Sequence, residues 1–526
     1  MATKKSFNTE GTCIPEKHYM VKNEGKLQEI LSTIRDNKYI VLNRPRQTGK
    51  TTTLHLMKRY IMPDYAYVYI SLEDIEDELF LSTQEFCSAL ADVFIYTIQH
   101  GNTGISVEAL EEFKNVHAQK NTLLNFITAL SSMCRINDKR IVLAIDEIDI
   151  ASDNAPFLRF LGALRNDYNQ GNPMFQSVIL AGVSDIRNLK SRIQNDEKTT
   201  KNNSLWNIAV NTSVNLFFSS DDIYAMLEDY RTERNISMDS RLISNLMMTQ
   251  TSGYPFLVSK LCWLIDCKVS NSAEFSSKQS AWTQDGFLMA LRLLNIERMQ
   301  LPVFQSLKNQ LEDNSKLYES LKNMLLLGTN YSIDESISEQ AIMHGFLKKD
   351  EQDNLHVTNV IFETFLYNIF INEQMSNIDP TQLIFESSDL KGSFFKARKF
   401  DADLVLAKFS SSYNKIFPDE LKPEMEKLAS FIFLMFIHNI VNGIGNYYIA
   451  PQTRDRKRLD VVIDYFGNQT VIELKIWHGK SQLAYYLDTF NLDTGYLLVF
   501  SNLKTKDVKG RFEDYINNKK IISYIV

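Results

Sequence analysis

The feature that most constrains this chain is a strand–loop–helix pattern over residues 38–60. Residues 39–42 are an apolar, β-branched run that predicts a buried strand. A polar turn follows Pro45 and ends in Gly49-Lys50-Thr51, and residues 52–60 predict a helix. Amide groups at a helix N-terminus attract an anion, a lysine adds positive charge, and a threonine hydroxyl can bind magnesium. The pattern therefore predicts a phosphate-binding loop.

The loop departs from the usual pattern at its first position. That pattern begins with glycine, and Arg44 stands in its place here. The prediction therefore needs support from other segments. The loop and first-turn residues that we expect to contact a nucleotide are Arg46, Gln47, Thr48, Gly49, Lys50, Thr51 and Thr52.

A second segment supplies carboxylates. Residues 141–145 are continuously apolar, as in a buried parallel strand, and they end in Asp146-Glu147. Ligands bind at the carboxyl ends of such strands. We expect Asp146 to hold Mg²⁺ together with Thr51, and Glu147 to polarise the attacking water. An apolar strand that ends by chance in two acids is the alternative, but the loop lies roughly 95 residues upstream in an alternating β/α pattern.

Two further features could complete such a site. Residues 175–183 predict another buried strand, which ends in Ser184-Asp185, and we expect Ser184 to sense the γ-phosphate. The predicted helix over residues 157–168 carries Arg159 and Arg165. Either could act as an arginine finger, although solvated helix residues are the default interpretation.

A Gly253-Tyr254-Pro255 turn opens an apolar helix, since proline is well tolerated in a first turn. The segments RPRQTGKT, AIDEID, FQSVILAGVSD, SLWNIAV and TSGYPFLVSKLCWL, in this order, resemble the AAA-like ATPase domains of many bacterial and archaeal genomes. The resemblance implies ATP and Mg²⁺ as cofactors and a lid turn that touches the nucleotide, here through Pro255. It also implies that a non-glycine residue is tolerated at Arg44.

The C-terminal part carries a second set of polar residues. Residues 458–464 and 470–477 predict two strands of a hairpin. Glu473 and Lys475 lie two apart and therefore on one face, and the hairpin can bring Asp460 to the same end. Asp460, Glu473 and the Leu474 carbonyl could share Mg²⁺, and Lys475 could orient the attacking water.

Asp460, a twelve-residue gap and Glu473-x-Lys475 form a short motif. The alternative to a metal site is an amphipathic hairpin edge with a charged outer row. Gln482, in the following predicted helix, could contact the water or a phosphate. The run VNGIG, RLDVVIDY, VIELKIW, QLAYYLD and GYLLVF resembles the PD-(D/E)xK domain fused behind AAA-like ATPases in the same family. The resemblance implies a restriction-endonuclease-like, magnesium-dependent nuclease. Cations at 454–458 fit either phosphate contacts or a solvated turn.

The predicted fold class is α/β. It combines a P-loop NTPase with a parallel sheet (1–235), a helical lid (236–290), a winged-helix-like module (291–375), a linker (376–404) and a PD-(D/E)xK nuclease domain (405–526). The net charge of −7 does not mark a nucleic-acid binder, but residues 401–526 hold 16 basic and 15 acidic residues against 41 and 49 elsewhere. We expect nucleic acid as a partner, DNA rather than RNA, and allow for a homo-oligomer.

Five scattered cysteines and the lack of a membrane-length apolar run predict a cytoplasmic protein without membrane association. We therefore expect an ATP-regulated, magnesium-dependent nuclease, with defence against foreign DNA as a biological role. The alternatives are an ATP-switched scaffold that binds nucleic acid without cleavage, and a DNA-repair or mobile-element ATPase.

Overall fold

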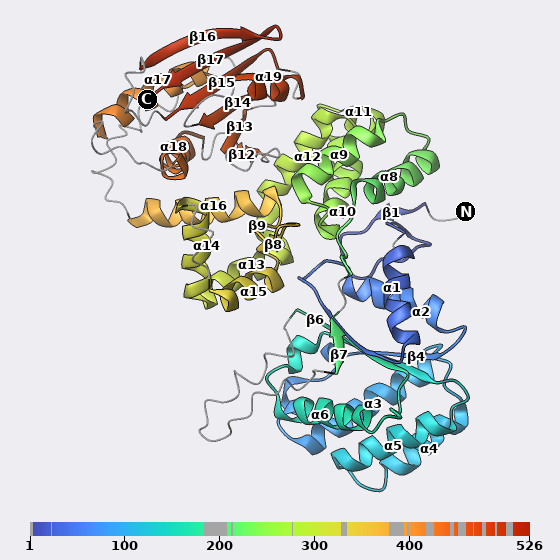
Figure 1. Cartoon of the computed structure of the whole chain (residues 1–526). Helices are drawn as coiled ribbons and strands as arrows, with labels where there is room; N and C mark the ends of the chain where they lie inside the picture. The colour runs from blue at the N-terminus through green and yellow to red at the C-terminus, as the bar shows by residue number, and fades with distance from the viewer. Residues whose placement is uncertain are drawn as a thin grey trace. The chain divides into compact units, whose positions relative to one another are not determined.

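The computed structural model describes residues 4–22, 24–183, 208–211, 214–275, 277–327, 334–377, 394–396, 399–416, 426–441, 446–450, 459–465, 468–475, 480–489, 492–500 and 509–526. The chain divides into two compact units. Unit 1 comprises Met1–Ser244, Gly253–Asp266 and Gln340–Gly345, and unit 2 comprises Asn245–Ser252, Cys267–Glu339 and Phe346–Val526. Figure 1 gives the element labels used below.

Unit 1 is built around a five-stranded parallel sheet in the order β4-β5-β6-β3-β7. Its strands are β3 (Tyr39–Asn43), β4 (Ala66–Ser71), β5 (Ile141–Asp146), β6 (Ser177–Gly182) and β7 (Ala209–Asn211). Every residue of β5 and β6 is buried, as expected of strands with both faces covered. The predicted α/β class with a parallel sheet is confirmed.

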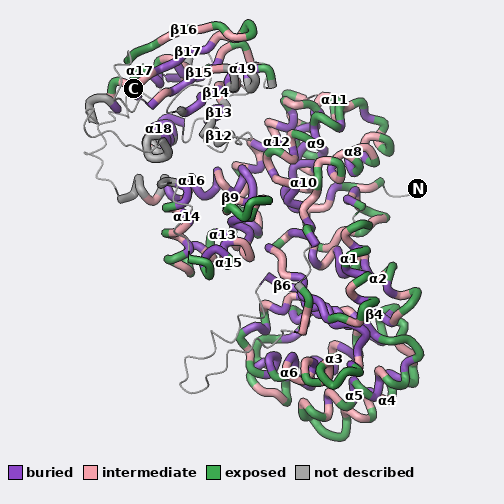
Figure 2. The backbone as a smooth tube through the Cα atoms, viewed as in Figure 1, coloured by how far each residue is buried: buried purple, intermediate pink, exposed green. Residues whose placement is uncertain are grey.

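Helices cover both faces of this sheet (Figure 1). On one face lie α1 (Glu24–Arg35) and α2 (Lys50–Ile61). On the other lie α3 (Thr83–His100), α4 (Val107–His117), α5 (Leu123–Ile136) and α6 (Ala155–Asn169). In Figure 2 the buried trace follows the sheet strands. Because β3 continues into α2 on one face and β5 into α6 on the other, the strand ends between them offer a place for a ligand.

The chain between β4 and α3 forms short turns. Two 3₁₀ turns, Leu72–Asp74 and Asp77–Phe80, precede α3, which begins after Ser82. The Ser82 side chain accepts a hydrogen bond from the Glu85 amide and so caps the helix there.

Unit 1 also contains a short parallel pair, β1 (Ser6–Phe7) and β2 (His18–Tyr19), and the helices α8 (Ser220–Arg234) and α10 (Pro255–Trp263). Phe7, Tyr19 and Tyr230 form a buried ring cluster with centroids 5.0–5.1 Å apart. This cluster packs the N-terminal segment onto α8. Helix α9 (Ser240–Thr251) runs from unit 1 into unit 2.

The chain between the two sheets is largely helical. From residue 278 to residue 377 the described α-helices and strands are α11 (Lys278–Ala281), α12 (Gln284–Glu297), α13 (Pro302–Asp313), α14 (Ser315–Leu327), α15 (Glu335–His344), β8 (Leu347–Lys349), β9 (Leu355–Val357) and α16 (Val360–Asn377). Within the segment 291–375, β8 and β9 form an antiparallel pair that follows α15. Helix α16 continues to Asn377, two residues into the segment 376–404 that is expected as a linker.

Unit 2 contains a six-stranded mixed sheet in the order β12-β13-β14-β15-β17-β16. Its strands are β12 (Asn446–Ala450), β13 (Leu459–Tyr465), β14 (Asn468–Lys475), β15 (Thr494–Val499), β16 (Gly510–Ile516) and β17 (Lys519–Ile525). The strands β14, β15 and β17 are mutually parallel, and the other pairs are antiparallel. The predicted hairpin is β13–β14.

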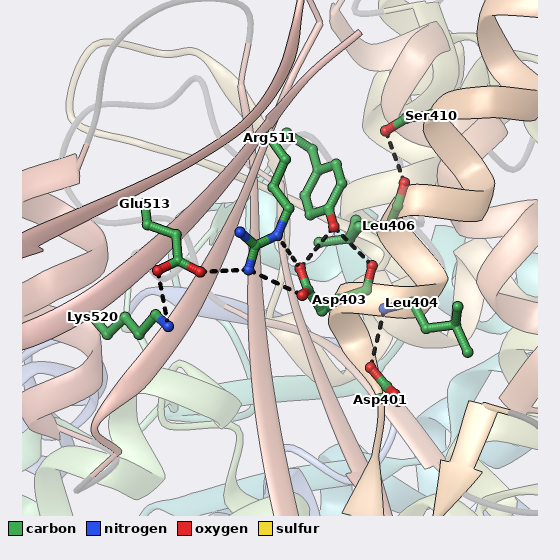
Figure 3. A network of polar contacts seen from close by, with 9 residues as sticks. Asp401, Asp403, Leu404, Leu406, Ser410, Arg511, Glu513 and Lys520 are labelled. Atoms are coloured by element: carbon green, nitrogen blue, oxygen red, sulfur yellow. Dashed lines mark hydrogen bonds and ion pairs between the residues drawn. The ribbon is translucent and has the colours of Figure 1, made fainter.

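Helix α19 (Lys480–Thr489) covers one face of this sheet. Its Leu483 and Leu487 pack tightly there, since a Cβ at Gly495 would lie 2.9 Å from Leu487 and 3.1 Å from Leu483. Helix α17 (Ala402–Ile416) is tied to the far sheet edge, where Arg511 contacts Asp403 at 2.8 and 3.0 Å (Figure 3). Helix α18 (Glu426–Val441) follows α17 in the chain.

Candidate functional site

The loop between β3 and α2 has the backbone expected of a phosphate-binding loop. Gly49 has φ +89° and directly precedes α2, and no atom lies within 4 Å of a Cβ built there. No side chain caps this helix, whereas serines or threonines cap α3, α4 and α5. Gln47 also has a positive φ, 57°. The first amide groups of α2 therefore lack the side-chain acceptor that caps those three helices.

Lys50 is held at the loop by backbone oxygens. Its ammonium group is buried and donates to the carbonyls of Arg44 at 3.0 Å and Pro45 at 3.2 Å. Burial lowers the pKa of Lys50, while the nearby carboxylates of Glu147 and Asp149 oppose that shift. A cation that is buried beside a loop of this kind favours a phosphate ligand, which would restore the lost solvation.

Thr51 and Asp146 come together as the sequence predicts. The Thr51 hydroxyl donates to Oδ2 of Asp146 at 2.7 Å, and Oδ1 accepts from the Glu147 amide at 3.0 Å. Asp146 is fully buried at the carboxyl end of β5. Adjacent hydroxyl and carboxylate oxygens are ligands that Mg²⁺ prefers, so these two residues fit such an ion.

Glu147 follows in a strained conformation, with φ 52° and ψ 41°. Burial raises the pKa of its carboxyl group, and Lys50 partly offsets this. A left-handed backbone at a non-glycine residue costs about 1 kcal/mol or more and persists where the surroundings enforce it. A raised pKa and an enforced orientation suit a group that accepts a hydrogen bond from an attacking water.

The structure explains why the first loop position is not glycine. The Arg44 amide donates to Gly182 O on β6 at 3.1 Å. Its guanidinium donates to the carbonyl of Val214 through Nε at 3.0 Å and Nη2 at 2.7 Å. Arg44 therefore attaches the loop to the segment after β7. The sequence carried no sign of this contact, because its acceptor is a backbone oxygen 170 residues away.

The Gly253-Tyr254-Pro255 turn also contacts the loop. Gly253 has φ +74°, and a Cβ there would lie 1.9 Å from the carbonyl oxygen of Phe218. The hydroxyl of Tyr254, which is buried, donates to the carbonyl of Arg46. Pro255 is the first residue of α10 and is buried. The turn thus reaches the loop through Tyr254, whereas Pro255 is the residue of this turn that is expected to touch the nucleotide.

The other predicted contact residues have varied surroundings. Arg46 is exposed, Thr48 donates to Pro45 O at 2.8 Å, and the Thr52 hydroxyl accepts from the Cys13 amide at 3.1 Å. Ser184 lies outside the described residues. Arg159 donates to the Thr83 hydroxyl at 3.0 Å. It therefore makes a surface contact between α6 and α3.

Sequence reasoning missed two side chains at this strand edge. Tyr69 donates to Oδ2 of Asp146 at 3.2 Å, and Asp149 accepts from the Val183 amide at 2.6 Å through its Oδ2. Burial, followed by the charge of Asp146, raises the pKa of Tyr69, so its hydroxyl remains a donor. The one feature of the sequence that could have indicated this contact is the position of Tyr69 near the carboxyl end of β4, the strand next to β5.

The second candidate site is defined by strand register in unit 2. Asp460 on β13 lies directly opposite Glu473 on β14, as predicted, and Lys475 lies two residues further along β14. Register places these three positions on the face that carries Val462 and Val471, which α19 covers. Glu473 is fully buried. The two carboxylate positions therefore form a cross-strand pair.

The structure describes only part of the remaining residues predicted for this site. The backbones of Asp460, Lys475 and Gln482 are described, Gln482 in the first turn of α19, whereas their side chains lie outside the described residues. Leu474 is buried on the opposite face from Glu473 and pairs in register with Leu459. Among the described side chains there is no group of three potential metal ligands. The ligand roles of Asp460, Glu473 and Leu474 stay predictions.

Comparison with known proteins gives distant structural similarity. No protein-family model matches the chain, and no curated protein sequence matches it. The Walker-type ATPase PABY2304 of Pyrococcus abyssi is similar at a TM-score of 0.43 and 14% identity, over 68% of this chain and 99% of that one. The ORC2 protein of Aeropyrum pernix in its ADP form gives 0.37 and 12%, over 70% and 97%.

The RuvB Holliday junction branch migration motor of Thermotoga maritima gives a TM-score of 0.34 and 12% identity, over 66% of this chain and 95% of that one. The function proposed below rests on the geometry of the sites.

Within the described ranges, no helix has the length and apolar character needed to cross a membrane.

Proposed function

We propose that unit 1 binds and hydrolyses ATP with Mg²⁺. The observation that carries this proposal is the 2.7 Å contact between Thr51 and Asp146, beside the buried Lys50, at the carboxyl ends of β3 and β5. A loop that offers amides and an ammonium group to phosphates, next to hydroxyl and carboxylate oxygens for a cation, suits a nucleoside triphosphate.

Each residue has a distinct role in this proposal. Lys50 exchanges the carbonyls of Arg44 and Pro45 for phosphate oxygens, and the α2 amides bind the same phosphates. Thr51 and Asp146 hold Mg²⁺, which neutralises charge on the phosphates when bound. Glu147 accepts a hydrogen bond from the attacking water and orients it toward the γ-phosphate.

Equilibrium binding and turnover test these roles separately. We expect Lys50→Ala to weaken ATP binding by about a hundredfold, since it removes a charge-assisted contact, while Glu147→Gln binds ATP and loses most hydrolysis. Lys58→Ala, on the same helix two turns further on, is the matched control and should behave as wild type. Wild-type protein that binds no ATP would contradict the proposal.

We further propose that unit 2 contains a magnesium-dependent nuclease whose activity ATP controls. The observation that favours it is the register pair Asp460–Glu473, with Glu473 fully buried. Buried charges in proteins are paired or bind metals, and Mg²⁺ takes carboxylate oxygens. Lys475, on the same face, would stabilise charge that develops on a phosphodiester. We expect DNA rather than RNA as the substrate.

Cleavage of plasmid and linear DNA tests this second proposal. Wild type should cleave with Mg²⁺ and stop with a chelator, and Glu473→Gln should lose at least about a hundredfold in rate. Asp493→Asn removes an exposed carboxylate of the same unit and should cleave normally. Binding of DNA without cleavage under any divalent metal would instead favour a nucleic-acid-binding scaffold. ATPase activity that DNA stimulates, without cleavage, would favour a repair or mobile-element ATPase.

A further inference from the structure

Asp146 is contacted from the neighbouring strand as well as from the loop. Tyr69 lies on β4, where its backbone pairs with Ala144 and that of Ser71 pairs with Asp146. Tyr69 is thus a diagonal neighbour of Asp146, a spacing that an aromatic side chain can span. Its hydroxyl reaches Oδ2 at 3.2 Å, the same oxygen that accepts from Thr51 at 2.7 Å.

The ring of Tyr69 is itself fixed by α2. The His55 ring lies 4.5 Å from it, centroid to centroid, with an interplanar angle of 43°. His55 follows Thr51 by one helical turn and therefore lies on the same side of α2. Tyr69 is accordingly held between α2 and the end of β5, with its hydroxyl on the carboxylate.

We infer that Tyr69 is a positioning residue that orients the Asp146 carboxylate for a divalent cation bound with the nucleotide. This inference rests on the proposed ATP site. Oδ2 of Asp146 accepts two hydrogen bonds and Oδ1 accepts one from the Glu147 amide, so three donors set the plane of the carboxylate. If a cation displaced the Thr51 hydrogen bond from Oδ2, Tyr69 and the Glu147 amide would still hold that plane. Loss of a partner that orients a metal ligand typically lowers metal affinity by about 10–100-fold.

The chain offers a matched control on the same strand. Tyr67 lies two residues before Tyr69, on the same face of β4, and its hydroxyl donates to Leu54 O at 2.9 Å. Tyr67→Phe and Tyr69→Phe each delete one hydroxyl that bonds to one acceptor, a buried one at Tyr67 and a partly buried one at Tyr69. Only Tyr69→Phe removes a contact to Asp146, so a difference between the two variants reports on that contact and not on general destabilisation.

The test is ATP affinity as a function of Mg²⁺ concentration, with a chelator as the zero point, on the full chain. We expect Tyr69→Phe to need about tenfold more Mg²⁺ for half of the affinity gain, with unchanged affinity in the chelator. Tyr67→Phe should match wild type, even where both variants melt at a lower temperature. Equal Mg²⁺ midpoints for Tyr69→Phe and wild type would overturn the inference.

A second measurement separates the possible failures. In an Asp146→Asn background, adding Tyr69→Phe should cause no further change in the Mg²⁺ midpoint, because the two residues act on one cation. Additive losses would contradict the inference. Wild type that binds ATP equally with and without Mg²⁺ would overturn this inference alone, whereas wild type that binds no ATP would overturn the proposed ATP site as well.

Discussion

The two candidate sites are held in place by different kinds of contact. In unit 1 the loop is braced by contacts to distant segments, Arg44 to Val214 and Tyr254 to Arg46, and Tyr69 contacts Asp146 beside it. In unit 2 the carboxylate positions are brought together by the backbone register of one hairpin. A loop has no regular ladder to fix its shape, so it needs such braces, whereas adjacent strands fix cross-strand pairs without them.

The largest effect on the contacts around the loop of unit 1 is expected at Gly253. Gly253→Ala would place a Cβ 1.9 Å from Phe218 O at a residue with φ +74°. We expect a loss of about 3 kcal/mol or more in the free energy of unfolding and failure to bind ATP, because the turn that carries Tyr254 must move. Urea unfolding and ATP titration measure both effects.

Gly162→Ala is the control for that variant. Gly162 lies inside α6 with no atom within 4 Å of an added Cβ. Alanine there should stabilise the protein by about 0.5–1 kcal/mol, because alanine is the better helix former. Equal stability of the two variants would contradict the close approach at Gly253.

Arg44 tests whether the loop needs its brace more than it needs the usual glycine. Arg44→Gly restores that glycine and removes two donors from Val214 O. We expect about 2 kcal/mol of destabilisation and weaker ATP binding, since hydrogen bonds from charged groups are worth about 1.5–3 kcal/mol. Calorimetry and ATP titration check this. Tighter ATP binding by Arg44→Gly would show that the arginine is a defect and not a brace.

For Arg511 in unit 2 we expect the opposite result: its removal should cost little stability and leave the candidate site unchanged. It contacts Asp403 and Glu513 (Figure 3), and Tyr524 donates to Asp403 at 2.7 Å. Tyr524 lies on the sheet face opposite that of Glu473, as register shows. Arg511→Ala should cost about 1 kcal/mol, a small value because the ion pair is partly exposed, and should leave Mg²⁺-dependent cleavage unchanged.

The same contact predicts a pH dependence. Burial raises the pKa of Asp403, but the hydrogen bonds from Arg511 and Tyr524 outweigh it and bring that pKa below its usual range. A carboxyl group with a depressed pKa stabilises the fold above its unfolded pKa of about 3.9 and loses that contribution as the pH falls. The free energy of unfolding of wild type should therefore decrease below about pH 4. That of Arg511→Ala should decrease by less over the same pH range.

Much of the fold could be predicted because it depends on local patterns. The continuous apolar runs of β3, β5 and β6 indicate buried parallel strands, and the spacing of Asp460 and Glu473 fits one hairpin. The contact between Thr51 and Asp146 followed from two motifs at the ends of parallel strands.

The braces of the loop could not be predicted in this way. Arg44 and Tyr254 donate to backbone carbonyls, which every residue possesses, so the acceptors leave no trace in the sequence. Tyr69 lies in an apolar strand, where a tyrosine normally indicates packing.

ATP control of cleavage tests the central claim most directly. DNA cleavage with Mg²⁺ would be measured with and without ATP for wild type, Lys50→Ala and Glu473→Gln. We predict that ATP changes the wild-type rate by about tenfold or more, that Lys50→Ala needs about a hundredfold more ATP for the same change, and that Glu473→Gln does not cleave. Equal ATP responses of wild type and Lys50→Ala, or cleavage by Glu473→Gln at the wild-type rate, would contradict it.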